Sequence, residues 1–514
     1  MRRRLVAAAS AALVLGLAAC TGGGGSDPTP TADDTQAPGS AESLTIGEIS
    51  FPASFDVNGY SIAHYVQYFN AVFDTLVRQD GDGEIVPGLA TEWAYDEART
   101  TLTLTLRDDV TFTDGTPFNA DAVVANVENF QASSTPDLSN AQYISDVTAV
   151  DDTHVQFTLS APDPMLLTWF TGSLGFEASP ASLTSPDVAT NPVGSGPYVL
   201  DADATVIGST YVFTKNPDYW DDSYVVYDTL TINYYETLTA LLNAIQGGQV
   251  DVATFQDVTS LDQVEAAGYT LNTSQLDWSG LIFYDRDGTV DEALGDVRVR
   301  QAINYAFDRE TILDVIQLGH GTATSQTFGE ATGGYLPELD SYYDYDPDKA
   351  RDLLAEAGYG DGLELVMPTM SALNQDLLTA IQQQLADIGI TVTLTDTGAN
   401  FITDLLGGKF TSSWLQLASA KDWQYAQLAL VPNATFNMFG NESDDLAPLF
   451  TAMQSGTDEE AAAAAQDVNR YLVEEAWFAP FFRIDNFYVS KPGYSVTMAA
   501  DNVTPYLYLI QPAS

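Results

Sequence analysis

The sequence predicts an α/β protein with two sheet-bearing lobes and a cleft between them. Strand-helix-strand patterns occur twice, at residues 230–252 and 363–394. Strands with strict two-residue alternation gather in a separate region at 85–192. About 470 residues follow the N-terminal segment, which is more than one hydrophobic core normally organises. We therefore expect at least two domains.

The first twenty residues have the parts of an export signal. Three arginines at positions 2–4 precede an apolar run from Leu5 to Ala19, and Cys20 follows. The run is short for a permanent membrane span. Residues 17–20, Leu-Ala-Ala-Cys, resemble the lipobox of bacterial lipoproteins, in which the signal is cleaved before the cysteine and the thiol carries a diacylglycerol. We expect residues 1–19 to be removed and Cys20 to be lipidated; an ordinary secretory signal with a chance cysteine is the alternative.

The segment after the signal has the composition of a tether. Cys20 is the only cysteine in 514 residues, so no internal disulfide forms. Thr21 to Ala41 are rich in Gly, Ser, Thr, Pro and Asp, which bury little apolar surface. Residues 20–41 are predicted to be a disordered tether with a root-mean-square span of roughly 25 Å. Two acyl chains suffice for stable anchoring. The expected location is therefore extracytoplasmic, at the outer face of the cell membrane, or on the periplasmic side if an outer membrane is present.

Acidic residues dominate the charge of the chain. There are 71 Asp and Glu against 18 Lys and Arg, which gives a formal net charge of −53. Nucleic acid is therefore excluded as a partner, and direct docking on anionic lipid is opposed. The acidic residues are spread along the chain, which is typical of a solvated protein surface. The alternative interpretation is that they attract cationic ligands. No second run of about eighteen apolar residues occurs, so we expect a body that does not cross the membrane.

The strands of the 85–192 region have the period of half-buried antiparallel strands. Leucine occupies every second position at 102–106, alternating with threonine. Apolar residues alternate in the same way at 155–159. We expect these segments to share one sheet.

The first strand-helix-strand unit begins with alternating apolar residues at 230–234. Leucine and isoleucine then recur at helical spacing over 238–245, and Gly247-Gly248 is expected to stop this helix. The chain returns as a strand at 250–252.

A short helix precedes the second unit. Asp346-Pro347 can cap and start it, and Gly358 can end it. The second unit then has a strand at 363–366 and a helical pattern over 377–388. Gly389 is expected to end this helix in the left-handed conformation, and the strand returns at 390–394. Parallel crossovers place binding crevices outside the strand ends, so the cleft is the expected ligand site.

Several sequence segments, spread along nearly the whole body, occur in the same order as the motifs of one protein family. They are PGLATEW at 87–93, LRDDVTFTDGTPFNADAVV at 106–124, GSGPY at 194–198, NPDYW at 216–220, DVRVRQAINYAFDR at 296–309 and YDYDPDKARDLLAEAG at 343–358. Together they resemble the extracellular solute-binding proteins, family 5, of peptide, nickel and oligopeptide ABC importers. Physically these segments are mostly scaffold, because they supply turns such as Asp114-Gly115 and a buried helical face at 299–307.

The resemblance implies a two-lobed periplasmic-binding-protein fold of class II type, with an extra α+β domain inserted in the first lobe. We expect the chain to cross between the lobes near Trp278 and Arg483. The expected domains are a first lobe of residues 42–84, 193–277 and 484–514, an inserted domain of residues 85–192, and a second lobe of residues 278–483.

The resemblance also implies a binding protein and not an enzyme. The expected function is the lipid-anchored substrate-binding component of an ABC importer, which captures a peptide-like or other small solute by hinge closure and delivers it to the permease. The implied partners are the ligand, the permease with its ATPase, and the membrane through the lipid anchor; no cofactor is implied, and a monomer is expected. A surface protein for signalling or adhesion and an anchored hydrolase are the alternatives.

Ligand contacts are expected on cleft loops, where aromatic rings offer apolar surface at low entropy cost. Trp414 and Trp423 lie where the family places its main ligand-reading loop. Peptide binders of the family usually have an aspartate there for the ligand's amino group, but residues 417–421 read Leu-Ala-Ser-Ala-Lys. Asp422 is either its substitute or a turn or capping residue. The expected ligand-binding residues are Phe51, Tyr60, His64, Tyr284, Trp414, Gln416, Asp422 and Trp423. Modified peptides, sugars, siderophore-like chelates and other amphipathic solutes remain open.

Motifs for catalysis and metal binding are absent from the sequence. It has no Gly-x-Ser-x-Gly elbow, His-Glu-x-x-His pair or phosphate loop, so no catalytic residue is expected. The three histidines are isolated, and no metal site is expected. Asp344-x-Asp346-x-Asp348 lacks the glycine and glutamate of a calcium loop. Residues 80–84 are interpreted as a hairpin turn.

Overall fold

The computed structural model describes residues 41–60, 63–135, 137–221, 223–224, 226–371, 373–419, 421–432 and 434–513. All of them belong to a single compact unit. The signal at 1–19 and residues 20–40 of the predicted tether, which include Cys20, lie outside the described residues, so lipidation stays a prediction. Ala41, predicted as the last tether residue, is the first residue of a strand. Within the described part of the chain, no helix is both long enough and apolar enough to span a membrane.

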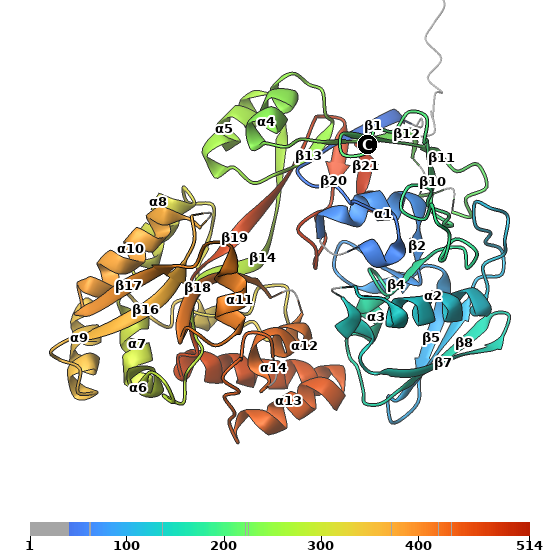
Figure 1. Cartoon of the computed structure of the whole chain (residues 1–514). Coiled ribbons are helices and arrows are strands. Elements are labelled where there is room, and N and C mark those ends of the chain that lie inside the picture. The colour runs from blue at the N-terminus through green and yellow to red at the C-terminus, as the bar shows by residue number, and fades with distance from the viewer. Residues whose placement is uncertain are drawn as a thin grey trace, which may run out of the picture. The chain divides into compact units, whose positions relative to one another are not determined.

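A mixed sheet of nine strands runs through the fold (Figure 1). Its order is β10-β11-β12-β1-β13-β19-β14-β18, and β15 pairs with β19. The strands are β1 (Ala41–Glu48), β10 (Tyr198–Leu200), β11 (Thr210–Lys215), β12 (Tyr227–Tyr234), β13 (Val252–Phe255), β14 (Thr270–Phe283), β15 (Gly321–Ala323), β18 (Ser412–Ala418) and β19 (Phe478–Ser490). The predicted α/β class is confirmed.

The first predicted strand-helix-strand unit is β12, α4 (Leu238–Gln246) and β13. Thr237 caps α4 by accepting the N–H of Ala240, and Gly248 follows the helix with φ +65°. β12 and β13 are not neighbours, because β1 lies between them and pairs in parallel with both. The helix α5 (Leu261–Ala266) packs beside α4.

Two long strands, β14 and β19, join the two lobes. Near one end β19 pairs with β13, and near the other end β14 pairs with β18. Trp278 of β14 is the register partner of Arg483 of β19. A register shift between Ser274 and Asp277 places a bulge in β14 where the strands pass from one lobe to the other. The predicted crossing points are therefore paired in the sheet, whereas the predicted domain boundaries stay a prediction.

The second lobe carries the second predicted unit. β16 (Leu363–Thr369) and β17 (Ile390–Asp396) are parallel and are joined by α10 (Gln375–Ala386). Gly389 has φ +94°, as expected for the residue that ends this segment. Asp346 caps α9 by accepting the N–H of Lys349, which confirms that this aspartate starts a helix. The other helices are α6 (Glu292–Gly295), α7 (Val297–Tyr305), α8 (Arg309–Ile316), α9 (Pro347–Glu356), α11 (Phe401–Leu406), α12 (Asp422–Tyr425), α13 (Leu446–Ser455) and α14 (Asp458–Glu474).

The region predicted as an inserted domain has its own antiparallel sheet. Its order is β5-β6-β8-β7, and the alternating leucines of 102–106 are buried in β6. The helix α2 (Ala120–Ala132) covers this sheet, and Asn119 caps it. The turn at 80–84 joins the hairpin strands β3 and β4, as predicted. The remaining elements are β2 (Asp74–Thr75), β3 (Val77–Gln79), β4 (Ile85–Pro87), β5 (Ala90–Tyr95), β6 (Thr101–Leu106), β7 (Ile144–Asp151), β8 (His154–Leu159), β9 (Phe176–Glu177) and α3 (Leu166–Trp169).

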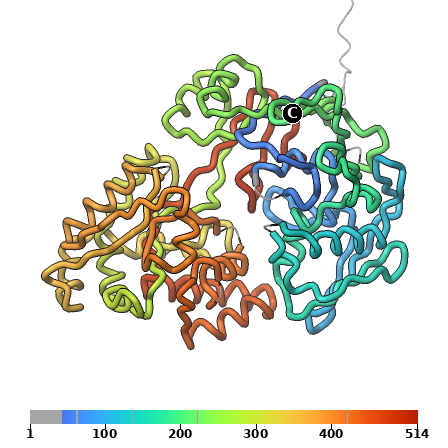
Figure 2. Tube along the Cα trace, viewed as in Figure 1, coloured from blue at the N-terminus to red at the C-terminus, as the bar shows by residue number. Residues whose placement is uncertain are grey.

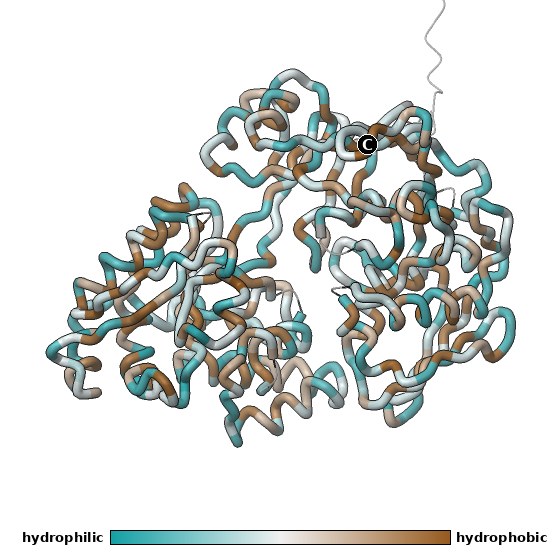
Figure 3. The backbone as a smooth tube through the Cα atoms, viewed as in Figure 1, coloured by the Kyte–Doolittle hydropathy of each residue, from teal (hydrophilic) through white to brown (hydrophobic). Residues whose placement is uncertain are grey.

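The C-terminal segment returns to the first lobe. β20 (Tyr494–Val496) and β21 (Ile510–Pro512) form a hairpin near β1, and the Tyr494 hydroxyl donates to the carbonyl oxygen of Ser43. Figure 2 shows the red C-terminal trace beside the blue N-terminal trace, which includes α1 (Val66–Val72). In Figure 3, hydrophobic and hydrophilic stretches are interspersed along the coloured trace of both lobes.

Candidate functional site

A cavity of about 270 Å³ lies where five segments distant in sequence meet. Tyr60 follows β1, residues 137–140 and 168–173 come from the region predicted as the inserted domain, Gln424 lies in α12, and residues 501–506 precede β21. All three predicted domains therefore contribute to its walls. A cavity of this kind is the usual form of a small-molecule site.

Two carboxylates act on the tyrosine in this cavity. Burial raises the pKa of Tyr60, and the negative charges of Asp137 and Asp501 raise it further. Burial also raises the pKa of Asp137 and of Asp501. The three side chains therefore form one electrostatically coupled, poorly solvated group.

Local contacts hold the C-terminal wall of the cavity. The Tyr506 hydroxyl donates to Oδ1 of Asp501 at 3.0 Å. The rings of Tyr506 and Tyr508 are stacked with centroids 5.2 Å apart. Asn502 is 7% exposed and its Oδ1 accepts the N–H of Thr504. This wall is therefore held in place by its own hydrogen bonds and ring packing.

A second polar group lies beside this wall, at the carboxyl ends of the parallel strands. Nδ1 of His64 is 3.2 Å from Oγ1 of Thr504 and 3.8 Å from Oε2 of Glu48. Oγ1 of Thr254 donates to Oε1 of Glu48. Burial raises the pKa of Glu48 to about 8 and lowers the pKa of His64. His64, a predicted ligand residue, therefore contacts the segment next to the cavity and does not line it.

Two predicted ligand residues, Trp414 and Gln416, lie on β18. Nε1 of Trp414 donates to Oγ of Ser279 at 2.9 Å. Nε2 of Gln416 donates to Oδ2 of Asp277 at 3.0 Å. Both side chains bond to the neighbouring strand β14, outside the cavity.

Asp422 and Trp423 begin α12. Oδ1 of Asp422 accepts the backbone N–H of Gly334, and burial raises the pKa of this carboxyl. The aspartate thus braces the loop at 332–334 in this structure. Trp423 is packed in the second-lobe core and lines another cavity, of about 350 Å³, together with Phe450 and Trp477.

The remaining predicted ligand residues, Tyr60, Phe51 and Tyr284, lie in three different parts of the structure. Tyr60 lines the cavity. Phe51 packs edge to face on Tyr234, with ring centroids 4.7 Å apart. Tyr284 is fully buried in the second-lobe core, where its hydroxyl lies 2.7 Å from Oγ of Ser413. Of the predicted ligand residues, Tyr60 alone is among the residues that line the cavity. Gln424, which was not predicted, also lines it and directly follows the predicted Trp423.

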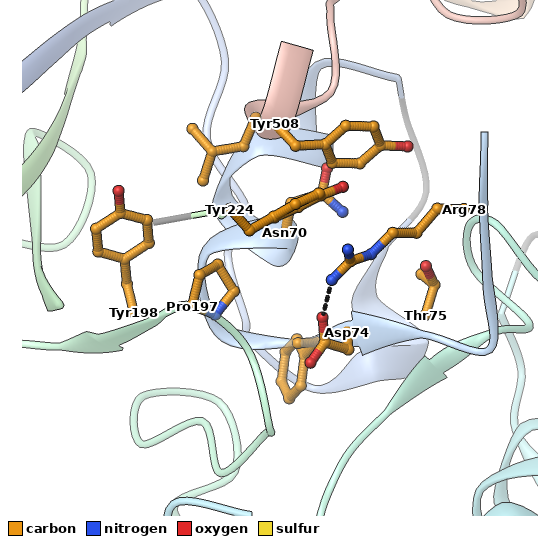
Figure 4. Close-up of a pocket in the computed structure, with 10 residues that line it drawn as sticks. Asn70, Asp74, Thr75, Arg78, Pro197, Tyr198, Tyr224 and Tyr508 are labelled. Carbon is orange, nitrogen blue, oxygen red and sulfur yellow. Dashed lines mark hydrogen bonds and ion pairs between the residues drawn. The ribbon is translucent and has the colours of Figure 1, made fainter. Parts of the chain in front are cut away.

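A third pocket, in the first lobe, is built around a buried ion pair (Figure 4). The Arg78 guanidinium donates to Asp74 at 3.0 Å and to Asp221 at 3.2 Å. The ring of Tyr224 covers the guanidinium at 3.7 Å. The cavity measures only about 20 Å³, so this group is structural.

Sequence reasoning missed most residues of the candidate cavity. Asp137 and Trp169 belong to the region predicted as the inserted domain, and Asp501 and Tyr506 to the C-terminal segment. None of them is part of a recognisable motif. The one sequence feature that could have indicated the cavity is the group of aromatic and acidic residues in the C-terminal part of the predicted first lobe, such as Asp501 and Tyr506. Within the described residues, no group of three or more His, Cys, Asp or Glu side chains is arranged to hold a metal ion.

Comparison with known proteins gives a consistent assignment. Residues 84–440 match the family model described as bacterial extracellular solute-binding proteins, family 5 Middle. Heme-binding protein A of Haemophilus influenzae is 28% identical over 431 residues, which cover 74% of each chain. The periplasmic murein peptide-binding protein MppA of Escherichia coli is 25% identical and covers 88% of this chain and 90% of its own.

Solved structures share the fold. HbpA2 from Haemophilus parasuis has a TM-score of 0.80 at 21% identity, with 92% of this chain and 100% of that chain covered. The ABC transporter substrate-binding protein CtaP from Listeria monocytogenes has a TM-score of 0.78 at 23% identity, with the same coverage. These likenesses confirm the two-lobed periplasmic-binding-protein fold.

Proposed function

Because the chain belongs to family 5 of the bacterial extracellular solute-binding proteins, we propose that it is the lipid-anchored substrate-binding component of an ABC importer. Proteins of this family bind solutes for transport outside the cytoplasm and are not enzymes. In this proposal the protein captures a small solute between its lobes and presents it to the permease. Cys20 carries the lipid anchor, and a monomer does the binding.

The cavity around Tyr60 is the observation that supports this proposal most directly. Its walls come from all three predicted domains, so a ligand in it touches each of them at once. A ligand that contacts both lobes binds the closed form more tightly than the open form. This difference in affinity stabilises the closed form. No chemical step is needed for this function.

Hydrogen bonds between the predicted domains support closure as the working motion. Nη1 of Arg99 donates to the carbonyl oxygen of Gly456 at 2.9 Å. Nε2 of Gln454 donates to the carbonyl oxygen of Pro162 at 3.1 Å. Both bonds join the region of the inserted domain to the second lobe, at α13 and the turn after it. They form only when the two parts are in contact.

The proposal is tested by native mass spectrometry of the gently purified protein, followed by a thermal-shift screen with peptides, oligosaccharides and metal chelates. A ligand at a hundred times its dissociation constant adds about 2.7 kcal/mol to stability, which corresponds to a shift of a few degrees. A solute that is retained or stabilising and is released unchanged supports the proposal. Conversion of the solute to products would overturn it.

A further inference from the structure

We infer that the cavity around Tyr60 selects a small organic cation, whose ammonium or guanidinium group lies between the carboxylates of Asp137 and Asp501. The inference rests on the proposed function and names the ligand class of the same cavity. Asp137 and Asp501 are then its specificity-determining residues.

The two carboxylates come from different segments and share one space. Asp137 precedes the 3₁₀ turn Leu138–Ala141, and Asp501 lies in the C-terminal segment. Both line the cavity, and both act electrostatically on the hydroxyl of Tyr60. A positive group beside this hydroxyl therefore interacts with two negative charges at once.

Neither carboxylate has a partner of opposite charge within ion-pair distance among the described residues. Two aspartates elsewhere do have a counter-charge: Asp74 pairs with Arg78 at 3.0 Å and Asp340 with Arg483 at 2.6 Å. Lys421 is the cation that acts on Asp501, but its Nζ is directed to the carbonyl oxygen of Gly83 at 3.5 Å. Poorly solvated carboxylates without a counter-charge are costly, and a bound cation removes that cost.

The local hydrogen bonds of the two carboxylates leave part of their acceptor capacity unused. Asp137 stands at the N-cap position of its 3₁₀ turn and makes no side-chain cap hydrogen bond; its carboxyl is hydrogen-bonded by Ser173. Asp501 accepts the Tyr506 hydroxyl through one oxygen, Oδ1, in the part of the chain that the structure describes. Each aspartate therefore keeps acceptor capacity for a ligand.

The rest of the lining also suits an organic cation. The aromatic rings of Tyr60, Trp169 and Tyr506 face or border the same cavity, and aromatic faces attract ammonium and guanidinium groups. The side-chain amides of Asn140 and Gln424 add donors and acceptors for the polar remainder of the ligand. The formal net charge of −53 attracts cations to the protein over longer distances.

The test compares matched probes on the purified protein. One pool contains dipeptides and tripeptides with free amino termini, the second contains the same peptides N-acetylated, and the third probe is spermidine. The free-amine pool or spermidine is expected to raise the melting temperature, and the acetylated pool to leave it unchanged. Equal stabilisation by the free and acetylated pools would overturn the inference.

Three variants assign the effect to the carboxylates. Asp501→Asn and Asp137→Asn each remove one charge with little change in shape, and each is expected to weaken binding of the stabilising probe about tenfold or more. Asp203→Asn removes the same charge from an exposed position outside the cavity and is expected to bind like the wild type. If one cavity variant does not fold, the other gives the answer, because the two residues lie in separate segments. Wild-type affinity in a folded cavity variant contradicts the inference.

The outcomes separate the two proposals. If only neutral or anionic solutes bind, the cation inference fails and the importer function stands. If no solute of any class binds, both fail.

Discussion

Several charged side chains in this protein are buried, and they differ in whether a counter-charge accompanies them. Arg483 is 2% exposed, and its guanidinium donates to both oxygens of Asp340. Glu48 and Glu177 are fully buried, and no ion pair within 4 Å other than the contact of Glu48 with His64 involves either one among the described residues. Oε2 of Glu48 has no hydrogen-bond partner in the described part of the chain. Buried carboxyls of this kind favour the protonated form.

Replacing Glu48 with glutamine is expected to make the protein more stable at alkaline pH. The pKa of Glu48 is raised by burial from 4.5 to about 8 in the folded protein. A raised carboxyl pKa means that the folded state binds the proton more tightly, so its stabilising effect is complete below about pH 4.5 and is lost as the pH rises to about 8. Glu48→Gln removes this loss, which is on the order of a few kcal/mol.

The measurement is the melting temperature of both proteins between pH 5 and pH 9. The difference between Glu48→Gln and wild type is expected to grow in favour of the variant as the pH rises. Glu84→Gln changes an exposed glutamate in the hairpin turn and serves as the control. Parallel pH profiles for Glu48→Gln and wild type would show that Glu48 does not titrate as described.

Secondary-structure elements in this fold begin with side-chain caps that the sequence displays. Asn119, Thr237, Asp308 and Asn374 each accept a backbone N–H of the helix that follows. The helix α14 has a full capping box, in which the side chains of Thr457 and Glu460 bond reciprocally to backbone N–H groups. Such elements are predictable because their signals lie within a few residues. The bulge in β14 has no such signal, because it depends on pairing with a strand far along the chain.

Removing the cap of α14 is expected to loosen its first turn. Thr457→Ala deletes the acceptor for the N–H of Glu460 and costs about 1 kcal/mol. By hydrogen exchange, amides in the first turn of α14 should then exchange about fivefold faster. Thr379→Ala, at an exposed position inside α10, removes a threonine that caps nothing and should leave exchange in α14 unchanged. Unaltered exchange at Glu460 in Thr457→Ala would contradict the role of the cap.

On the scale of the whole molecule, two lobes are joined by β14 and β19 and meet again through side chains that reach across. β14 and β19 are paired along most of their length, so the lobes are connected by continuous hydrogen-bonded sheet. The hydrogen bonds of Arg99 and Gln454 with the opposite part are partly buried, and Met165 of the region predicted as the inserted domain packs in the second-lobe core. This combination suits a hinge that closes on a ligand and opens again.

Arg99→Ala is expected to weaken ligand binding without destabilising the free protein. The hydrogen bond from Arg99 to Gly456 joins the two parts of the chain, so its loss is expected to weaken the form in which these parts are in contact. A loss of 0.5–1 kcal/mol corresponds to a dissociation constant about two- to fivefold higher. Isothermal titration with the retained solute measures it. Arg470→Ala removes an arginine that pairs with Glu338 within the second lobe and should bind normally; equal weakening in both variants would argue against a closure contact.

Cys20→Ser is expected to release the protein from the membrane. The variant retains the export run but has no thiol for a diacylglycerol. Fractionation should find the wild type with the membrane, and intact mass should show a mature chain that starts at lipidated Cys20. Membrane association of the variant, or a wild-type mass without lipid, would contradict the anchor.

The sequence by itself determined the family, the α/β class, the two strand-helix-strand units with the turns at Gly248 and Gly389, and the alternating strands of the 85–192 region. It could do so because hydrophobic period, capping and turn chemistry act over a few residues. Tertiary structure alone decided that β1 separates β12 from β13, and that Asp422 braces a loop. It also decided which residues line the cavity, because Asp137, Gln424 and Asp501 meet only after the lobes have folded and come together. No local pattern encodes a contact between segments that are brought together by the packing of the whole chain.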